Sequence, residues 1–177
     1  MSKLTTRQIT RIALMIAFIS VASYIRIPLP FSEVALTAQT LVICTLALLL
    51  SPLETVVTMV SYWLLGFVGA PVYGGISGPS KMFGPTGGYL FGFILAAVFI
   101  SCLKGKKYSF WRRFIITVLG SLMIINGIGF VWMKHVTGIT WEAAFLTGFL
   151  PYIPLDIIKC IVAIYLAKAF QRVLDLH

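Results

Sequence analysis

The sequence is poor in charge, and above all in negative charge. Charged residues make up only 11% of its 177 residues, and Asp and Glu together number 5. A soluble globular domain has about 25% charged residues, because a chain of this size leaves much of its surface in water. With 59% hydrophobic residues, the chain has too few polar side chains to cover such a surface. This composition excludes an ordinary soluble enzyme and a disordered chain, and it predicts an integral membrane protein.

Metal ligands and catalytic motifs are also scarce. The chain has 3 cysteines and 2 histidines, and their spacing matches no metal site and no complete disulfide framework. The sequence contains no HExxH, no GxSxG and no GxxxxGK[ST] phosphate loop. We therefore expect no metal, no cofactor and no enzymatic activity.

Six apolar runs are separated by polar or Gly- and Pro-rich breaks. A helix needs about 20 residues to cross a bilayer, and the pattern predicts an all-α membrane protein with six transmembrane helices in a single domain over residues 1–177. The segments 27–36 and 70–85 are predicted to be irregular loops. Pro151 and Pro154 interrupt the last run, which then continues as one helix to residue 174. The predicted spans are 8–26, 37–51, 53–69, 86–103, 112–133 and about 142–174.

The basic residues are divided unequally between the two sides of this topology. With the N-terminus inside, ten of the 14 lie on the inner side and three, Arg26, Lys81 and Lys134, on the outer side, while Lys159 lies within the last span. Because inner loops carry an excess of Lys and Arg, both termini are predicted to be cytoplasmic. The net charge of +9 is then a topology signal rather than a sign of a nucleic-acid partner. The ten inner residues are Lys3, Arg7, Arg11, Lys104, Lys106, Lys107, Arg112, Arg113, Lys168 and Arg172.

Asp156 and Lys159 stand inside the apolar run 153–167. A charge at mid-membrane costs about 2.5–3.5 kcal/mol on insertion scales, and the i,i+3 spacing puts both side chains on one helix face. Asp156 is expected in the first turn after Pro154, where the helix dipole favours an anion. Two interpretations stay open: a pair that only stabilises the helix, or a polar pocket near the outer leaflet. In a pocket, Asp156 would accept ligand N–H groups and Lys159 would neutralise a ligand carboxylate, or the roles would be exchanged.

The segments that border the spans add further candidates. Tyr73 and Tyr89 flank glycine-rich backbone that lets a ligand approach closely, and their rings can stack on or clasp a ligand ring. The alternative is a plain outer loop with tyrosines in the interfacial aromatic belt. Gln39 can donate and accept at a pocket rim, or it is only a polar residue at a helix start. The candidate ligand-binding residues are Asp156, Lys159, Tyr73, Gly75, Tyr89, Thr86, Gln39 and Thr37.

The first span carries two small residues four positions apart. Ala13 and Ala17 flatten one helix face, so that another helix can approach closely. This pair is the candidate surface for a partner helix.

Four motifs occur in order along nearly the whole chain. They are Thr37-Ala38-Gln39-Thr40-Leu41, Gly69-Ala70-Pro71-Val72-Tyr73, Gly84-Pro85-Thr86-Gly87-Gly88-Tyr89-Leu90 and Pro151-Tyr152-Ile153-Pro154-Leu155-Asp156-Ile157-Ile158-Lys159. Together they resemble the BioY family, the biotin-binding S components of energy-coupling factor (ECF) transporters. The resemblance implies an S-component bundle of six helices with both ends in the cytoplasm, which binds biotin near the extracellular side under the first and third outer loops.

The resemblance also implies a ligand and partners. Biotin has a ureido ring with two N–H donors and one carbonyl, an apolar thioether ring and a carboxylate tail, and Asp156, Lys159 and the tyrosine-bearing loop match these groups. A membrane T component with two ATPase subunits would supply the energy, and Ala13 and Ala17 would dock on it. We therefore expect a multi-pass subunit for biotin uptake in the bacterial plasma membrane.

Other functions stay open as alternatives. The chain would instead be an S component for another vitamin, although Lys159 argues against thiamine, or a biotin transporter that works without an ATPase module. An intramembrane enzyme would need a second catalytic group beside Asp156. A structural subunit would use Asp156 and Lys159 for folding only.

Overall fold

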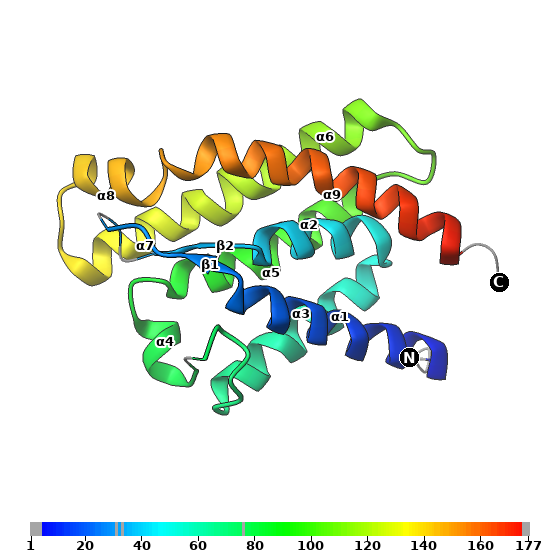
Figure 1. Cartoon of the computed structure of the whole chain (residues 1–177), viewed down its shortest axis with the longest axis horizontal. Coiled ribbons are helices and arrows are strands. Elements are labelled where there is room, and N and C mark those ends of the chain that lie inside the picture. Colours follow the sequence, from blue (N-terminus) through cyan, green and yellow to red (C-terminus); the bar gives the residue numbers. More distant parts are fainter. Residues whose placement is uncertain (1–4, 31, 33, 76, 175–177) are drawn as a thin grey trace.

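Long helices run through the computed structural model of the protein, which describes residues 5–30, 32, 34–75 and 77–174 (Figure 1). A two-residue antiparallel pair, β1 (Arg26–Ile27) and β2 (Leu36–Thr37), joins Arg26 to Thr37 and Ile27 to Leu36. The helices are α1 (Thr6–Tyr24), α2 (Gln39–Leu49), α3 (Pro52–Phe67), α4 (Pro79–Phe83), α5 (Gly87–Leu103), α6 (Phe110–Val118), the π-helical η1 (Leu119–Asn126), α7 (Gly127–Thr137), α8 (Trp141–Gly148) and α9 (Tyr152–Leu174).

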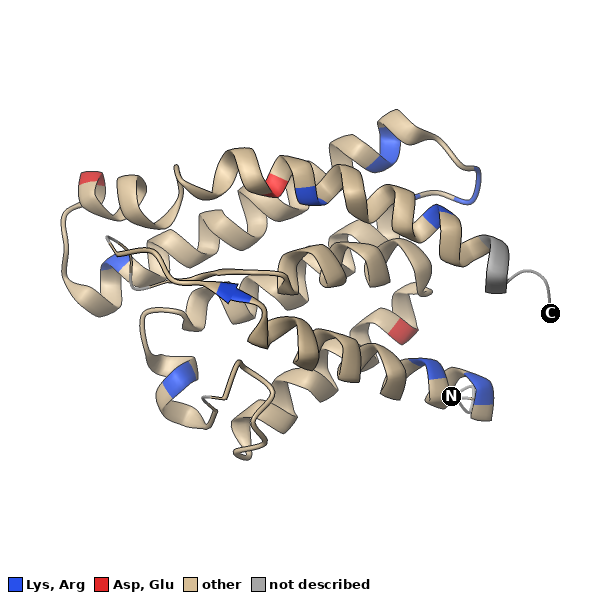
Figure 2. Ribbon diagram, viewed as in Figure 1, with Lys and Arg blue, Asp and Glu red and all other residues tan. Residues whose placement is uncertain are grey.

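The first four predicted spans correspond to α1, α2, α3 and α5, the fifth to α6, η1 and α7 in succession, and the last to α8 and α9. The helical stretches Phe110–Thr137 and Trp141–Gln171 are long and apolar enough to cross a bilayer, and α2 and α5 are shorter apolar helices. The start of α1 and the last turns of α9 lie at one end of the bundle (right in Figure 1), and β1, β2, α4 and α8 lie toward the other. Most basic residues gather at the first of these ends (Figure 2). Lys3 lies outside the described residues.

Three local expectations were wrong. The segments 27–36 and 70–85 are not wholly irregular, because strand pairing closes the first, with Thr37 in β2 rather than on a helix, and α4 lies in the second. Pro154 does not interrupt a helix, because it lies in the first turn of α9, where a missing N–H leaves no helical hydrogen bond unmade. Since α9 begins at Tyr152, Asp156 lies in its second turn and not in its first.

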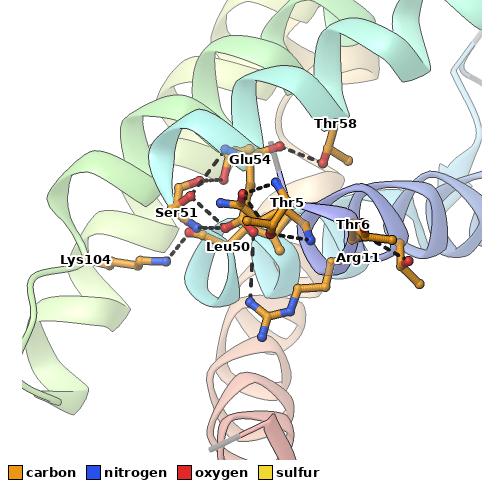
Figure 3. A network of polar contacts seen from close by, with 11 residues as sticks. Thr5, Thr6, Arg11, Leu50, Ser51, Glu54, Thr58 and Lys104 are labelled. Carbon is orange, nitrogen blue, oxygen red and sulfur yellow. Dashed lines mark hydrogen bonds and ion pairs between the residues drawn. The ribbon is translucent and has the colours of Figure 1, made fainter. Parts of the chain in front are cut away.

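A polar network fixes the end of the bundle near the start of α1 (Figure 3). Ser51 caps α3 with a reciprocal hydrogen bond to Glu54, and Glu54 lies 4.0 Å from the guanidinium of Arg11 on α1. The Lys104 ammonium, at the end of α5, donates to the carbonyl oxygens of Ala47, at 3.2 Å, and Leu50. Burial lowers the pKa of Lys104 to about 8, with a further lowering by Arg113 that Glu54 partly opposes. Helices α1, α2, α3 and α5 are thereby tied together at this end.

Small residues let α5 approach the helix formed by η1 and α7. A Cβ atom on Gly92 would lie 2.9 Å from the Cα of Ile125 and 3.2 Å from the carbonyl oxygen of Ile124. These neighbours are backbone atoms, which cannot rotate away as a side chain can. Close backbone approach through glycine is the usual way for helices to associate in a membrane, and here it places η1 against the bundle core.

We expect Gly92→Ala to lower the free energy of unfolding by about 1–3 kcal/mol, because the methyl group overpacks this contact. Gly127→Ala is the matched control: its Cβ would meet nothing closer than the carbonyl oxygen of Leu122 at 3.9 Å, and alanine is a better helix former. Thermal unfolding in detergent measures both variants. It is followed, in a Cys102→Ser background that removes the exposed thiol, with a thiol-reactive dye that reaches the buried Cys44 and Cys160 only on unfolding. Equal midpoints would contradict the close-packing account.

Candidate ligand-binding site

A cavity of about 220 Å³ lies at the end of the bundle away from the start of α1. Its walls come from segments far apart in the sequence: the end of α1, the strands β1 and β2, the first turns of α2, α5 and α9, the helix α4 and the end of η1. Polar side chains and apolar ones both line it. Such a concave, mixed surface formed by several helices is typical of a small-molecule site.

The charged pair predicted from the sequence lies in the wall of this cavity. The Lys159 ammonium is 3.0 Å from Oδ1 of Asp156, and the side-chain amide of Asn126 donates to Oδ2 at 2.8 Å. Asp156 is only 2% exposed. A buried charge is stable only when it is paired and hydrogen-bonded, and here each carboxylate oxygen has its own donor. The two interpretations of the pair are therefore not exclusive, since it is an ion pair and also lines a cavity.

Asn126 reaches this carboxylate from the last position of η1. In a π-helix each turn holds an extra residue, so residues after it face a direction that 3.6-residue spacing does not predict. The glycine contacts of η1 with α5 and the bond from Asn126 to α9 fix the segment from two sides. Isolated π-turns inside helices are frequent at functional sites.

A second polar group is built around Gln39, the first residue of α2. Its amide nitrogen donates to the hydroxyl of Tyr62 on α3 at 2.6 Å, and that hydroxyl donates to the carbonyl oxygen of Val72 at 2.9 Å. Gln39 is 7% exposed and Tyr62 is 2% exposed. This chain connects the cavity wall to the segment after α3.

Three tyrosines offer the cavity their rings rather than their hydroxyl groups. The Tyr89 hydroxyl donates to the carbonyl oxygen of Gly148 at 2.5 Å, that of Tyr73 to Trp63 at 2.9 Å, and that of Tyr152 to Val34. Their phenol groups are thus satisfied by backbone, and the rings are held rigidly. Together with Leu90, Phe93 and Ile125, they form the apolar part of the wall.

Two basic residues border the same cavity, one on β1 and the other on α4. Arg26 is exposed on β1, and Lys81 is half-buried on α4. Burial lowers the pKa of Lys81, and the nearby charge of Arg26 lowers it further. In the part of the chain that the structure describes, neither forms an ion pair with an acidic residue. Two like charges at one cavity attract an anion.

The cavity brings together most of the residues predicted from the sequence. Gly75 is the exception: it is exposed, with a φ of +84°, and lies beside Tyr24 rather than in the cavity wall. Asn126, Arg26, Lys81 and Tyr152 line the cavity but were not predicted as ligand-binding residues. The predicted residues that line it are Asp156, Lys159, Tyr73, Tyr89, Thr86, Gln39 and Thr37.

One sequence signal for Asn126 was available. It is the only asparagine in the chain and lies within an apolar run, where a polar side chain usually has a partner. Its partner was not readable, because the rotation of its helix depends on the π-helical segment. Arg26 and Lys81 were assigned to outer loops as topology signals, and nothing in their spacing placed them beside Asp156.

Comparison of the chain with known proteins identifies its family. The BioY family model matches residues 1–176 of the chain. The chain belongs to the BioY family. The biotin transporter BioY2 of Lactococcus lactis is 39% identical to it over 169 residues, which cover 94% of this chain and 91% of that protein. The biotin transporter BioY of Thermotoga maritima is 36% identical over 169 residues, covering 94% and 96% of the two chains.

The fold is also that of a known transporter component. A crystal structure of the S-component for biotin from an ECF-type ABC transporter superposes with a TM-score of 0.89 and 24% identity, over 96% of this chain and 95% of that one. The mostly helical bundle is therefore an S-component fold, as expected from the four motifs. Fold, family and composition agree that this BioY-family chain is a membrane protein.

We expect Lys159→Met to destabilise the protein by about 3 kcal/mol or more, because it leaves the carboxylate of Asp156 buried without its cation. The double variant Asp156→Asn/Lys159→Met has no such charge and should recover most of this loss, since the Asn126 amide can still donate to the new side chain. Unfolding in mixed micelles, titrated with SDS, measures both. If Lys159→Met were as stable as the double variant, the ion pair between Asp156 and Lys159 would not contribute this stability.

Proposed function

We propose that the protein is the substrate-binding subunit of a biotin uptake system and that it captures biotin in the cavity beside Asp156. Membership of the BioY family and the names of the relatives support biotin as the ligand. The single observation that carries the proposal is the chemistry of the cavity. It has hydrogen-bond acceptors and an ammonium in one wall, aromatic rings along another, and cations near the outer loops.

The proposed topology has six membrane spans with both termini in the cytoplasm of a bacterial cell. The basic residues support it, because they gather at the end of the bundle that holds the start of α1 (Figure 2), as the positive-inside rule requires. The cavity then opens toward the extracellular side, where an uptake protein meets its substrate.

The ureido ring of biotin matches the group around Asp156. An N–H group of the ring can donate to the carboxylate of Asp156, and the ring's carbonyl oxygen can accept from the Lys159 ammonium. The ion pair and Asn126 hold these atoms in place before a ligand arrives, so that little ordering remains to be done on binding. The apolar thioether ring would lie against Tyr89 and Phe93.

Arg26 and Lys81 are the partners that we propose for the biotin carboxylate. Lys159 is already paired with Asp156 at 3.0 Å, and a second carboxylate beside it would be repelled by the first. At the outer loops the carboxylate keeps part of its hydration, and full burial of that charge, which is costly, is avoided. This arrangement keeps the role first considered for Asp156 and gives Lys159 the ureido carbonyl oxygen instead of the carboxylate.

We expect the double variant Arg26→Gln/Lys81→Gln to bind biotin at least about tenfold more weakly, because a charge-assisted hydrogen bond is lost. Biotin amide, which has no carboxylate, should lose less than about twofold. Titration calorimetry with detergent-purified protein measures both ligands. The control, Asp156→Asn/Lys159→Met, should weaken both ligands alike, because both contain the ureido ring.

Several outcomes would overturn parts of this proposal. A selective loss of biotin over its amide in the Lys159 control would put the carboxylate at Lys159 instead. Displacement of biotin by thiamine or riboflavin in competition would favour an S component of another specificity. Absence of biotin binding by folded wild type would remove the proposed function.

The energy for uptake is proposed to come from an ECF module, a membrane T component with two ATPase subunits. The S-component fold supports such partners. Ala13 and Ala17 are both exposed on α1, where a partner helix can approach them closely. We therefore propose this face of α1 as the surface that docks on the T component. Transport without an ATPase module is the alternative.

We expect Ala13→Leu and Ala17→Leu to leave biotin binding unchanged and to reduce co-purification with the T component, because the added side chains hold the partner helix away. Ile9→Leu is the matched control, since Ile9 is an exposed residue of the same helix whose size is kept. Undiminished co-purification of both alanine variants would refute this docking face.

A further inference from the structure

Tyr62 lies behind the cavity wall, and its hydroxyl contacts one hydrogen-bond donor and one acceptor. It is 2% exposed, and the ring of Tyr73 packs edge-on against it with centroids 5.2 Å apart. Its hydroxyl oxygen is 2.6 Å from the amide nitrogen of Gln39 and 2.9 Å from the carbonyl oxygen of Val72. Both contacts join segments that meet at the cavity.

The direction of these two hydrogen bonds follows from counting protons. A backbone carbonyl can only accept, and a phenol hydroxyl has one proton to give. The Tyr62 proton therefore goes to Val72, and the hydroxyl oxygen is left to accept from Gln39. The side-chain amide of glutamine has a donor end and an acceptor end of almost equal shape. Tyr62 therefore binds the donor end, the amide nitrogen, and Oε1 of Gln39 remains to accept a hydrogen bond in the cavity.

Gln39 and Asp156 line the same cavity from neighbouring helices. Helices α2 and α9 pack against each other, and Gln39 and Asp156 lie in the first and second turns of these helices. The wall that they share therefore offers an amide oxygen and a carboxylate, both of which are hydrogen-bond acceptors.

We propose that Tyr62 is a positioning residue that holds the Gln39 amide with its oxygen toward the ligand, so that Gln39 and Asp156 together accept the two N–H groups of a cyclic urea. This inference rests on the proposed function and names the feature of biotin that the site recognises. A ring that presents an acceptor in place of either N–H would meet an oxygen and be repelled. Without the Tyr62 hydroxyl, the Gln39 amide is free to turn and the preference is lost.

A double-mutant cycle on biotin affinity tests this role. We expect Tyr62→Phe to weaken biotin about tenfold when Gln39 is present, the scale of one hydrogen bond. In a Gln39→Met background, Tyr62→Phe should change the affinity less than about twofold, because there is no amide left to orient. Tyr24→Phe is the matched control: it removes another hydroxyl that bonds a carbonyl of the same loop, that of Pro71 at 2.7 Å, without touching Gln39.

A second variant tests the orientation without altering Tyr62. In Gln39→Glu, the new side chain in its neutral carboxylic-acid form can donate its O–H to Tyr62 and keep its carbonyl oxygen toward the ligand. We expect this variant at pH 5 to bind biotin within about threefold of wild type at the same pH, and more tightly than Gln39→Met. An affinity of Gln39→Glu at pH 5 as low as that of Gln39→Met would contradict the need for an acceptor at this position.

The outcomes separate this inference from the function on which it rests. Equal weakening by Tyr62→Phe in both backgrounds would make Tyr62 a structural residue and leave the proposed function intact. The same loss in Tyr24→Phe would assign the effect to loop anchoring. Failure of folded wild type to bind biotin would remove both the function and the inference.

Discussion

The structure depends most on the need to satisfy one buried carboxylate in an apolar bundle. Asp156 is 2% exposed and lies in a helix made largely of apolar residues, so its charge is stable only with donors on both oxygens. Lys159 supplies one from the same helix, and Asn126 supplies the other from η1. This requirement fixes the rotation of α9 and the position of η1 relative to it. The glycine contact between α5 and η1 then fixes the position of the cavity wall that these two segments form.

Hydrogen bonds within the protein also fix the other side chains of the cavity wall, so that their polar atoms have partners before any ligand enters. The hydroxyl groups of Tyr73, Tyr89 and Tyr152 bond to backbone carbonyls, so these rings form a fixed apolar surface. In the proposed complex, binding uses acceptors and donors that already have their orientation, which reduces the entropy lost on binding. The charged ligand group is left to the outer loops, where solvent still contributes.

The sequence predicted the main helices and the charged pair because both follow from local rules. Apolar run length locates helices, and i,i+3 spacing puts Asp156 and Lys159 together on any helix. What it could not predict depends on contacts between segments. The partner of Asn126 depends on the π-helical register of η1, which no residue pattern predicts. Arg26 and Lys81 line the cavity because a two-residue strand pair and a five-residue helix place them there. The start of α9 at Tyr152 was misplaced because Pro154 was taken as a break, although proline is well tolerated in a first turn. Gly75 was included for its place in a glycine-rich motif, and its side of the loop was not readable.

The crystal structure of the protein with biotin would test the central claim most directly, since anomalous scattering from the thioether sulfur fixes the direction of the ligand. Our account predicts the ureido ring within hydrogen-bond distance of Asp156 and Lys159, and the carboxylate beside Arg26 and Lys81. A ligand in the reverse direction, with its carboxylate at Lys159, or one bound outside this cavity, would contradict it.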